Sequence, residues 1–315
     1  MQLIKLSKRE MSFLTELCNS KRPKFSDIAR KLHMSKEMVT YTYKKLQEKK
    51  ILKGMKPLLN YSCIGYSLYR AYVKLSPEVF AHEEDLLEYF KTVENIQSVV
   101  NTDGKYDNEL NFLLKNAIEM SAIYNKILDV HGKDIFQFHL HILAKTIYKL
   151  PFKESNNISI SMTEQTHTLD DIDIKILQLL TKTNWLTTIE ISRILNISFN
   201  TVKNRIINLE EKGVIVGYYP IINYDILGKK SIKIMVDCLN NTYAQRISSK
   251  LREISSVTTI TQAIGPYDIE FKCVVDSVNE AIEIINNLKK EFPIVQYDMN
   301  FTNKELYFNT IFSKT

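Results

Sequence analysis

The sequence predicts an α+β fold of two tandem units, each with three helices and a short hairpin followed by a βαββαβ sheet domain. Residues 6–65 align on residues 169–228 without a gap, and about sixteen of the sixty positions are identical. Further on, a Gly-Lys-Tyr-Asp turn at 104–107 meets a Gly-Pro-Tyr-Asp turn at 265–268 after a shift of two residues. In both copies the apolar spacing changes from helical to strand-like after the aligned segment.

These observations divide the chain into five segments. Each copy has a helical part, at 1–65 and 169–228, and a sheet domain, at 66–150 and 229–315. The join at 151–168 is rich in Ser, Asn and Thr and has no sustained apolar period. It predicts an exposed linker.

In the second copy, apolar residues at helical spacing over 172–180 predict the first helix. A second helix is expected at 188–195, with Thr187 or Thr188 as its N-cap, and a tight turn follows at 196–197. Ser198 is a good N-cap for a third helix, which Gly213 ends.

After that helix, residues 214–222 predict a short hairpin, the wing of a winged helix-turn-helix. The first copy repeats the plan with helices at 26–32 and 35–50 and a wing at 51–59. Lys50 stands where the second copy has Gly213, so this helix end is expected to be less well capped.

The rest of each unit alternates strand-like and helix-like segments in the order βαββαβ, a ferredoxin-like sheet with two helices on one face. The first copy is expected to form them at 67–75, 83–92, 96–103, 106–114, 118–128 and 135–142. The second is expected to form them at 230–238, 244–254, 257–263, 267–275, 278–292 and 294–302, with a final strand at 304–312. The uncovered face of each sheet needs a partner, which the sister copy can supply.

The chain has a net charge of +6, and its basic character belongs to the N-terminal fifth. Residues 1–65 hold fifteen Lys and Arg against five Asp and Glu, whereas residues 169–228 hold six against seven. A net charge of +10 on the first helical part indicates a polyanionic partner, the alternative being a solvated charged surface.

Several motifs of the second copy carry a family resemblance. They are the run Leu-Asp-Asp-Ile-Asp-Ile-Lys-Ile-Leu at 169–177, the third-helix segment at 197–206, Leu-Glu-Glu-Lys-Gly-Val-Ile at 209–215 and the later Gly-Pro-Tyr-Asp turn. In this order they resemble the leucine-responsive/asparagine-synthase regulator (Lrp/AsnC) family, and the first copy matches more weakly through Leu6, Leu46 and its Gly-Lys-Tyr-Asp turn. The resemblance implies a tandem form of a DNA-binding transcription regulator whose usual members carry one unit per chain.

The resemblance also implies partners. The winged helices would bind double-stranded DNA, and the sheet domains, of the RAM type, would pair as an intramolecular pseudo-dimer. Small effectors, often amino acids, would bind near the Gly-x-Tyr-Asp turns. The resemblance leaves open whether the chain represses or activates transcription, which operator sequence it binds and whether it forms further homo-oligomers.

The third helix of each copy is expected to enter the major groove. Its outward residues are the predicted DNA contacts: Ser35, Lys36, Glu37, Thr40, Tyr41, Lys44, Lys45, Ser198, Asn200, Thr201, Lys203, Asn204, Arg205 and Asn208. In the first copy Met38, Val39, Tyr43 and Leu46 are expected on the core face. Asn and Arg suit bidentate contacts to bases, and Lys, Ser and Thr suit phosphates.

The two Gly-x-Tyr-Asp turns are the predicted effector contacts, because glycine permits a strained backbone and an aspartate can receive an amino group. Their residues are Gly104, Tyr106, Asp107, Gly265, Tyr267 and Asp268. The alternative is a pair of hairpins that need Gly and Asp for their turns alone.

We expect no enzyme activity, cofactor or metal. His139 and His141 share one side of a strand, but no further ligand cluster accompanies them. A haem-precursor decarboxylase on the same fold would need acid–base and carboxylate-binding groups, and the candidates His131, His139, His141 and Arg70 belong to no identifiable motif. A protein–protein adaptor with winged helices is the other alternative.

The sequence contains no apolar run of the length a membrane helix needs, and residues 1–9 do not read as an export signal. We therefore expect a cytoplasmic protein without a membrane partner. The four cysteines are far apart and form no Cys-x-x-Cys pair, which argues against a disulfide framework or structural zinc.

Overall fold

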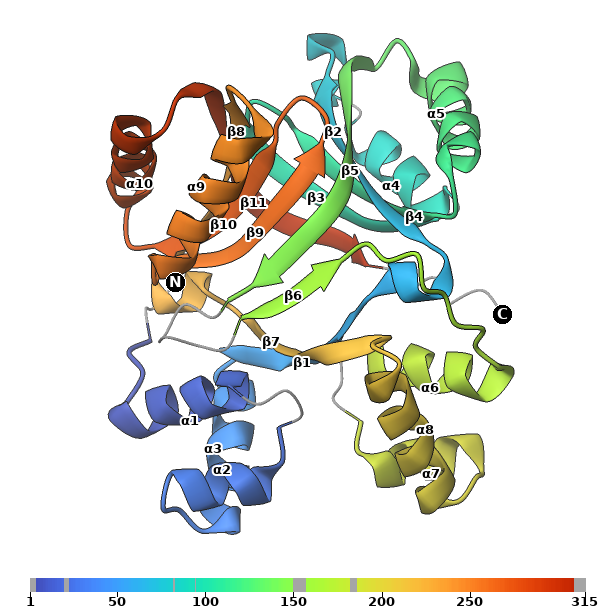
Figure 1. Ribbon diagram of the computed structural model, residues 1–315, viewed down its shortest axis with the longest axis vertical. Coiled ribbons are helices and arrows are strands. Elements are labelled where there is room, and N and C mark those ends of the chain that lie inside the picture. Colours follow the sequence, from blue (N-terminus) through green and yellow to red (C-terminus); the bar gives the residue numbers. More distant parts are fainter. Residues whose placement is uncertain are drawn as a thin grey trace.

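The computed structural model describes residues 4–19, 23–81, 83–93, 95–149, 157–181 and 186–308. The helical parts of both copies lie side by side in one layer, and the two sheet domains form a second layer above them (Figure 1). The strands β1 and β7 lie between the two layers.

The first copy follows the expected order of elements. They are α1 (Lys8–Asn19), α2 (Phe25–Lys31), α3 (Lys36–Glu48), β1 (Leu52–Leu59), the 3-10 helix η1 (Tyr61–Ile64), β2 (Ser67–Leu75), the 3-10 helix η2 (Pro77–Ala81), α4 (Glu83–Thr92), β3 (Ile96–Gly104), β4 (Asn108–Leu114), α5 (Ala117–His131) and β5 (Ile135–Tyr148).

The second copy begins after a short strand, β6 (Ile158–Ser161). Its elements are α6 (Asp171–Thr181), α7 (Thr188–Leu195), α8 (Phe199–Glu211), β7 (Ile215–Ile222), the 3-10 helix η3 (Asp225–Leu227), β8 (Lys230–Cys238), α9 (Asn241–Glu253), β9 (Val257–Ile264), β10 (Ile269–Val275), α10 (Val278–Glu291) and β11 (Ile294–Phe308).

The prediction of a separate wing hairpin in each copy is wrong. Each expected hairpin is one continuous strand, and β1 of the first copy pairs antiparallel with β7 of the second, from Leu52 opposite Ile222 to Leu59 opposite Ile215. A hairpin inside eight or nine residues would leave only a few residues for each strand. Pairing with the sister copy gives each strand a longer ladder.

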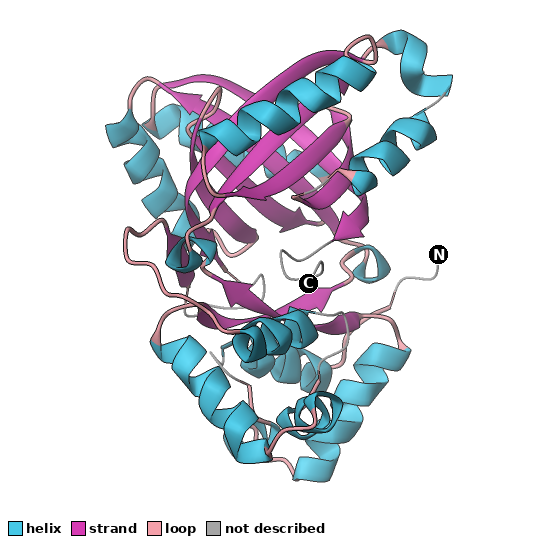
Figure 2. Ribbon diagram, turned by 90° about the vertical axis from the view of Figure 1, so that its right-hand side faces the viewer, coloured by secondary structure: helices cyan, strands magenta, loops and turns pink. Residues whose placement is uncertain are grey.

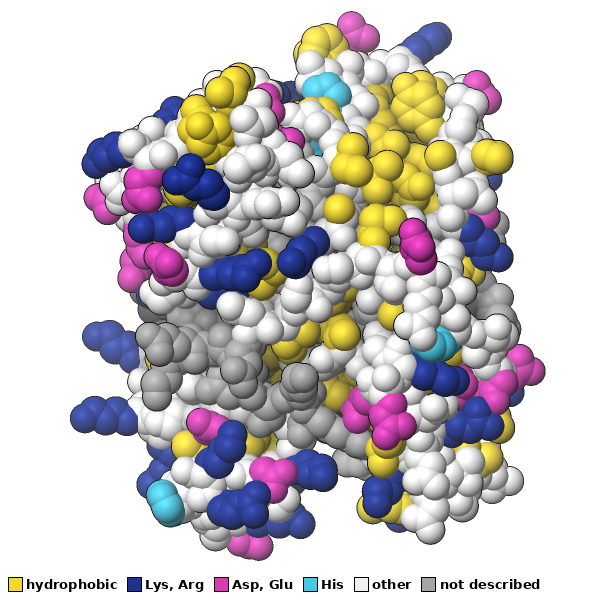
Figure 3. All heavy atoms as spheres, viewed as in Figure 1, with side chains coloured by type: hydrophobic (Ala, Val, Ile, Leu, Met, Phe, Trp, Pro, Cys, Tyr) yellow, Lys and Arg dark blue, Asp and Glu magenta, His cyan; other side chains and the backbone are white. Residues whose placement is uncertain are grey.

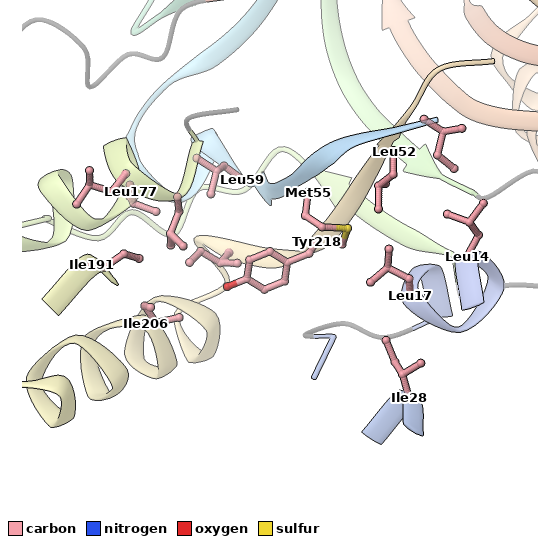
Figure 4. Close-up of a cluster of buried hydrophobic side chains, with 14 of the residues drawn as sticks. Leu14, Leu17, Ile28, Leu52, Met55, Leu59, Leu177, Ile191, Ile206 and Tyr218 are labelled. Atoms are coloured by element: carbon pink, nitrogen blue, oxygen red, sulfur yellow. The ribbon is translucent and has the colours of Figure 1, made fainter. Parts of the chain in front are cut away.

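This shared sheet joins the two helical parts into one hydrophobic core. Figure 4 shows Leu14 and Leu17 of the first copy on one side and Leu177 and Ile206 of the second on the other, with Tyr218 of β7 between them. Burial of this continuous apolar surface is the main force that holds the two helical parts together.

Two reciprocal hydrogen bonds add to this connection. The backbone N–H of Ile4, before α1, donates to the carbonyl of Ile226 in η3 at 3.0 Å, and that of His167, before α6, donates to the carbonyl of Cys63 in η1 at 2.6 Å. Each copy thus places the chain before its first helix on the 3-10 helix of the other copy.

The sheet domains join edge to edge as well as facing each other. Within each copy the strands run in the ferredoxin-like order, β5-β2-β4-β3 and β11-β8-β10-β9. Between copies, β5 pairs with β9 and β11 pairs with β3, so eight of the described strands close into a barrel (Figure 2). Closure leaves these strands without a free edge.

The sequence prediction therefore needs a correction at both last strands. β5 extends six residues beyond the expected end at 142, and this extension pairs with β9. The strands expected at 294–302 and 304–312 form one strand, β11, as far as Phe308, and residues 309–312 lie outside the described residues. The sister copy supplies the backbone partner that each longer strand needs.

Part of the expected linker is also a strand. Residues 151–156 lie outside the described residues, but β6 pairs with β5, from Ile158 opposite Tyr148 to Ser161 opposite Lys145. Its alternating Ile and Ser residues suit an edge strand with one side toward the protein. On that side, a Cβ atom on Gly217 of β7 would come within 2.6 Å of the Ile158 side chain, so β6 also packs closely on β7.

Candidate nucleic-acid interface

Helix α3 presents most of its predicted DNA contacts to solvent. Ser35 is its N-cap and accepts a hydrogen bond from the backbone N–H of Met38. Val39 and Leu46 are buried as expected, whereas the Met38 side chain is exposed, which corrects its expected place on the core face. Of the predicted contacts, five are exposed and two are half-buried: Ser35, Lys36, Glu37, Tyr41 and Lys44, and then Thr40 and Lys45.

The neighbouring lysines Lys44 and Lys45 differ in their surroundings. Nζ of Lys45 lies 3.6 Å from Oε1 of Glu10, and Nζ of Lys49 lies 2.7 Å from the same oxygen. Burial of Glu10 raises its pKa, but hydrogen bonds from Lys49 and Ser7 outweigh this effect and hold the pKa at about 2. Lys44 is exposed and forms no ion pair with a described residue, which leaves its charge available to a phosphate.

Helix α8 follows the same plan. Asn196, at the end of α7, takes a left-handed conformation with φ of 52°, and Ser198 caps α8 by accepting from the N–H of Thr201. The predicted contacts Ser198, Asn200, Lys203 and Asn204 are exposed, and Thr201, Arg205 and Asn208 are half-buried. Contacts of the exposed asparagines to base edges stay a prediction.

Arg205 is held by acids of its own copy. Its guanidinium contacts the carboxylate of Asp170 and lies 3.3 Å from Oδ1 of Asp173, which is buried. Asp173 aligns with Glu10 in the first copy, so both copies tie the third helix to an acid of the first helix. The sequence reasoning did not find these acids, although the shared position in the repeat was a usable signal.

The surface charge differs between the two helical parts. Lys and Arg side chains gather on the helices of the first copy, at the lower left of Figure 3. The net charge of +10 on residues 1–65 stands against −1 on residues 169–228. A polyanion would therefore be attracted mainly to the first copy.

The predicted effector turns lie where the two sheet domains join, and their glycines, Gly104 and Gly265, are exposed. Tyr106 and Tyr267 are buried, and their hydroxyl oxygens are 3.2 Å apart. Asp107 accepts hydrogen bonds from the Lys74 side chain and the Leu75 N–H, both at 2.7 Å. These contacts serve the fold, and the assignment of the turns to effector binding stays a prediction.

The glycines of these turns are needed for a close approach between copies. Gly104 has a φ of 132°, and a Cβ there would lie 2.3 Å from the carbonyl oxygen of Met299 in β11. A Cβ on Gly265 would lie 2.7 Å from the carbonyl oxygen of Leu140 in β5. Each turn therefore sits directly against the last strand of the sister copy.

Four charged side chains inside the barrel contact one another and are here called the central charge cluster: Arg70, Glu109, Lys233 and Glu270. Arg70 contacts Glu270 and lies 3.0 Å from Glu109, and Lys233 contacts Glu109. Burial raises the pKa of Glu109, but Arg70 and Lys233 outweigh it and lower the pKa to about 2. The same balance holds the pKa of Glu270 well below its usual range.

Sequence reasoning found only one member of this cluster in advance, Arg70. Arg70 and Lys233 occupy equivalent positions of the repeat, as do Glu109 and Glu270, and each interrupts the apolar pattern of a strand. A charged residue at the same strand position in both copies is the signal that would have revealed the cluster.

The histidines considered for catalysis separate into two places. His139 lies beside the tyrosine pair, with Nδ1 2.7 Å from the hydroxyl of Tyr106, and Nδ1 of His141 lies 3.2 Å from Glu270. His131 lies apart at the end of α5, beside Asp134. Across the described ranges, no three His, Cys, Asp or Glu side chains are grouped to hold a metal ion.

No helix in the described part of the chain combines the length and the apolar character that a membrane crossing requires.

Comparison with known proteins agrees with this geometry. Residues 169–216 match the family model of winged helix-turn-helix DNA-binding domains. The chain is 36% identical over 100 residues to the HTH-type transcriptional regulator Ptr1 of Methanocaldococcus jannaschii, a match that covers 32% of this chain and 68% of that protein. The chain belongs to the Lrp/AsnC family of transcription regulators.

A second relative of this Lrp/AsnC chain is the HTH-type transcriptional regulator FL11 of Pyrococcus furiosus. The two are 30% identical over 104 residues, which cover 33% of this chain and 69% of FL11. Both matches have the length of less than one repeat unit, as expected when a tandem chain is compared with shorter relatives.

Over its whole length the Lrp/AsnC chain has a fold similar to the siroheme decarboxylase NirDL. The TM-score is 0.67, the alignment covers 97% of this chain and 94% of that chain, and the identity is 12%. At this identity the likeness concerns the fold, and it agrees with the two-unit architecture.

Proposed function

We propose that the chain regulates transcription by binding one stretch of duplex DNA with both third helices, α3 and α8. The supporting observation is the joint core of the two helical parts, which holds two exposed recognition helices on the same layer of the molecule. This proposal agrees with the cytoplasmic location expected from the sequence.

The two helices carry different chemistry. Lys36 and Lys44 of α3 supply charge for phosphates, whereas Asn200 and Asn204 of α8 supply amides that suit bidentate contacts to adenine. Two unlike helices in one chain favour an operator of two unlike half-sites, where a homodimer favours a palindrome. The first copy supplies the greater part of the salt-dependent affinity.

The test is the affinity for a fluorescent duplex of the chain's own promoter region, compared with a scrambled duplex, over 50 to 200 mM salt. We expect promoter binding in the nanomolar range that weakens with salt. Lys44→Ala should reduce the slope of log K against log salt by about 0.9, the value for one phosphate contact. Lys126→Ala, which removes an exposed lysine from α5, is the matched control and should leave the slope unchanged.

Two other results would lead elsewhere. Equal affinity for both duplexes would indicate an architectural DNA-binding protein, and no binding at low salt would favour a protein–protein adaptor. In either case the specific-regulator proposal fails.

A decarboxylase-like enzyme is the second candidate, because the fold resembles that of NirDL, and Arg70, His139 and His141 all lie on the inner side of the barrel. Against it, Arg70 is paired with two buried carboxylates and His141 is fully buried. Mixing the chain with an iron tetrapyrrole should therefore leave the visible spectrum of the tetrapyrrole unchanged, and a shifted spectrum would support the enzyme.

We also propose that a small effector bound at the sheet domains controls the affinity for DNA. A ligand that binds between a sheet domain and β1 or β7 can change how the two recognition helices are held, since these two strands connect both helical parts. A ligand-dependent change of promoter affinity is the expected sign of this control.

A further inference from the structure

A cavity of about 230 Å³ lies where the helical layer meets the barrel. Its walls come from β1 and β7 below, from β5 and β6 beside them, and from η1 at one end. The space-filling view shows hydrophobic side chains in the recess between the two layers (Figure 3). The cavity therefore borders both the elements that hold the recognition helices and the elements of the sheet domain.

The lining combines aromatic rings with positive charge. Tyr61, Tyr148 and Tyr219 provide rings, and the rings of Tyr148 and Tyr219 meet edge to face with centroids 5.9 Å apart. Lys56 and Lys145 also line the cavity, and no Asp or Glu is among its described lining residues. An apolar body with a negatively charged group fits this environment.

Two tyrosines add hydrogen-bond donors. Burial raises the pKa of Tyr61 and of Tyr148, so both hydroxyls stay protonated. Tyr61 already accepts a hydrogen bond from Nε2 of Gln97 at 2.7 Å, which leaves its own proton free to be donated. Lys145 is half-buried and takes part in none of the ion pairs among the described residues.

We propose that this cavity binds a small aromatic carboxylic acid, which controls DNA binding by connecting the β1–β7 sheet to the barrel. The Lys145 ammonium and the tyrosine hydroxyls receive the carboxylate, and the tyrosine rings and Leu143 surround the aromatic body. The volume lies below the range of about 300 to 1,000 Å³ that drug-sized ligands need, so a single ring is the expected size.

The lining should also bind carboxylic acids more tightly than the corresponding amino acids. An α-amino acid brings an ammonium group, and the described lining offers two lysines and no carboxylate to receive it. The cavity should therefore prefer a 2-oxo acid to the amino acid with the same side chain. The effect on DNA rests on the proposed function, whereas the binding itself does not.

The position of the cavity indicates how a bound ligand acts on the DNA-binding helices. The Asn60 side chain, which follows β1, donates to the carbonyl of Ser161 in β6 at 3.2 Å, and the Asn60 N–H donates to the carbonyl of Val214 after α8 at 2.9 Å. Asn60 thus connects the edge strand of the barrel, the shared sheet and the end of a recognition helix. A ligand beside Asn60 contacts both the shared sheet and the barrel. It therefore stabilises the relative position of the two layers in which both contacts can form.

The experiment is calorimetric titration of the full chain with phenylpyruvate, benzoate and phenylacetate, and with phenylalanine as the matched amino acid. We expect at least one of the three acids to bind, and phenylpyruvate to bind at least tenfold more tightly than phenylalanine. Lys145→Gln should weaken acid binding at least tenfold. Lys126→Gln, on the outer surface of α5, is the control for general attraction of anions and should have no effect.

The outcomes distinguish failure of the proposed binding site from failure of the proposed regulatory function. Failure of all three acids to bind at millimolar concentration overturns the site, as does equal loss in the two lysine variants or preference for phenylalanine. The regulatory step is measured as promoter affinity with and without the acid that binds, and an unchanged affinity overturns the coupling. If the chain binds no DNA at all, the proposed function fails while acid binding that needs Lys145 still supports the site.

Discussion

Replacing Arg70 with methionine removes a buried guanidinium from the centre of the barrel. Arg70 lies 3.0 Å from Oε1 of Glu109 and 2.9 Å from Oδ1 of Asn111, and it also contacts Glu270. After the replacement Glu109 keeps its ion pair with Lys233, whereas Glu270 keeps His141 at 3.2 Å and only the charge of Lys233 without an ion pair between them. The variant therefore leaves a carboxylate with 2% exposure poorly compensated.

The magnitude follows from this imbalance. Removing one partner of a buried ion pair costs about 3 to 5 kcal/mol of unfolding free energy. Because Glu109 retains a lysine, we expect Arg70→Met to lie near the lower end, at about 3 kcal/mol. Adding Glu270→Gln to Arg70→Met removes the uncompensated charge and should recover at least half of the loss.

The pH dependence of the free energy of unfolding is a second test, because its direction should reverse in the variant. In the unmodified chain the pKa values of Glu109 and Glu270 are lowered, so their stabilisation is fully present above about pH 4.5 and is lost as the pH falls toward 2. In Arg70→Met the pKa of Glu270 should rise above 4.5, and the folded state then takes up a proton that the unfolded state does not hold. The variant should therefore lose stability as the pH rises from 5 to 7, the opposite direction.

Urea unfolding followed by circular dichroism at pH 5 and pH 7 measures both effects. The single variants Arg70→Met and Glu270→Gln and the double variant complete a mutant cycle. The reasoning is refuted if Arg70→Met stays within 1 kcal/mol of the unmodified chain, or if the losses in the double variant simply add.

Three further variants test local features by urea unfolding. Glu10→Gln should lower the free energy of unfolding by about 3 kcal/mol at most near pH 7 and not at all near pH 2. The reason is that the lowered pKa of Glu10 stabilises the fold above about pH 4.5, and this effect is lost as the pH falls to about 2. Equal costs at both pH values would contradict this reasoning. Gly104→Ala should cost more than 2 kcal/mol, from positive φ strain and the contact with Met299, and a neutral result would show that β11 can move away. Thr187→Ala removes a capping box with Glu190 and should lower the free energy of unfolding by about 1 kcal/mol. Thr187→Ser keeps the capping hydroxyl and should largely avoid this loss.

Much of the local structure was predictable because it depends on neighbours in the sequence. Ser35 and Ser198 cap the third helices through hydrogen bonds to residues three positions on, and Asn196 forms the expected turn. At the end of α3, Lys50 adopts the left-handed conformation, with φ of 56°, that Gly213 adopts at the equivalent position with φ of 70°. A lysine there is strained, in agreement with the weaker cap expected from sequence.

The site residues were only partly predictable, for a physical reason. Periodicity places Lys44 and Arg205 on the outer side of a helix, but it does not show that Arg205 faces Asp170 and Asp173 across the helix bundle. In the same way, alternation places His141 on one face of a strand without showing that Glu270, 129 positions away in the sequence, lies opposite. Contacts of this kind depend on the relative position of elements that the sequence leaves far apart.

By itself the sequence determined the duplication, the order of the elements and the exposed faces of the recognition helices, since all of these follow from local spacing and from comparison of the two copies. The tertiary structure decided how the copies join. It paired β1 with β7 in place of two separate hairpins, and closed the barrel through β5 and β11. Backbone hydrogen bonds can be made with any strand that offers a free edge, so only the assembled copies determine which strand is the partner.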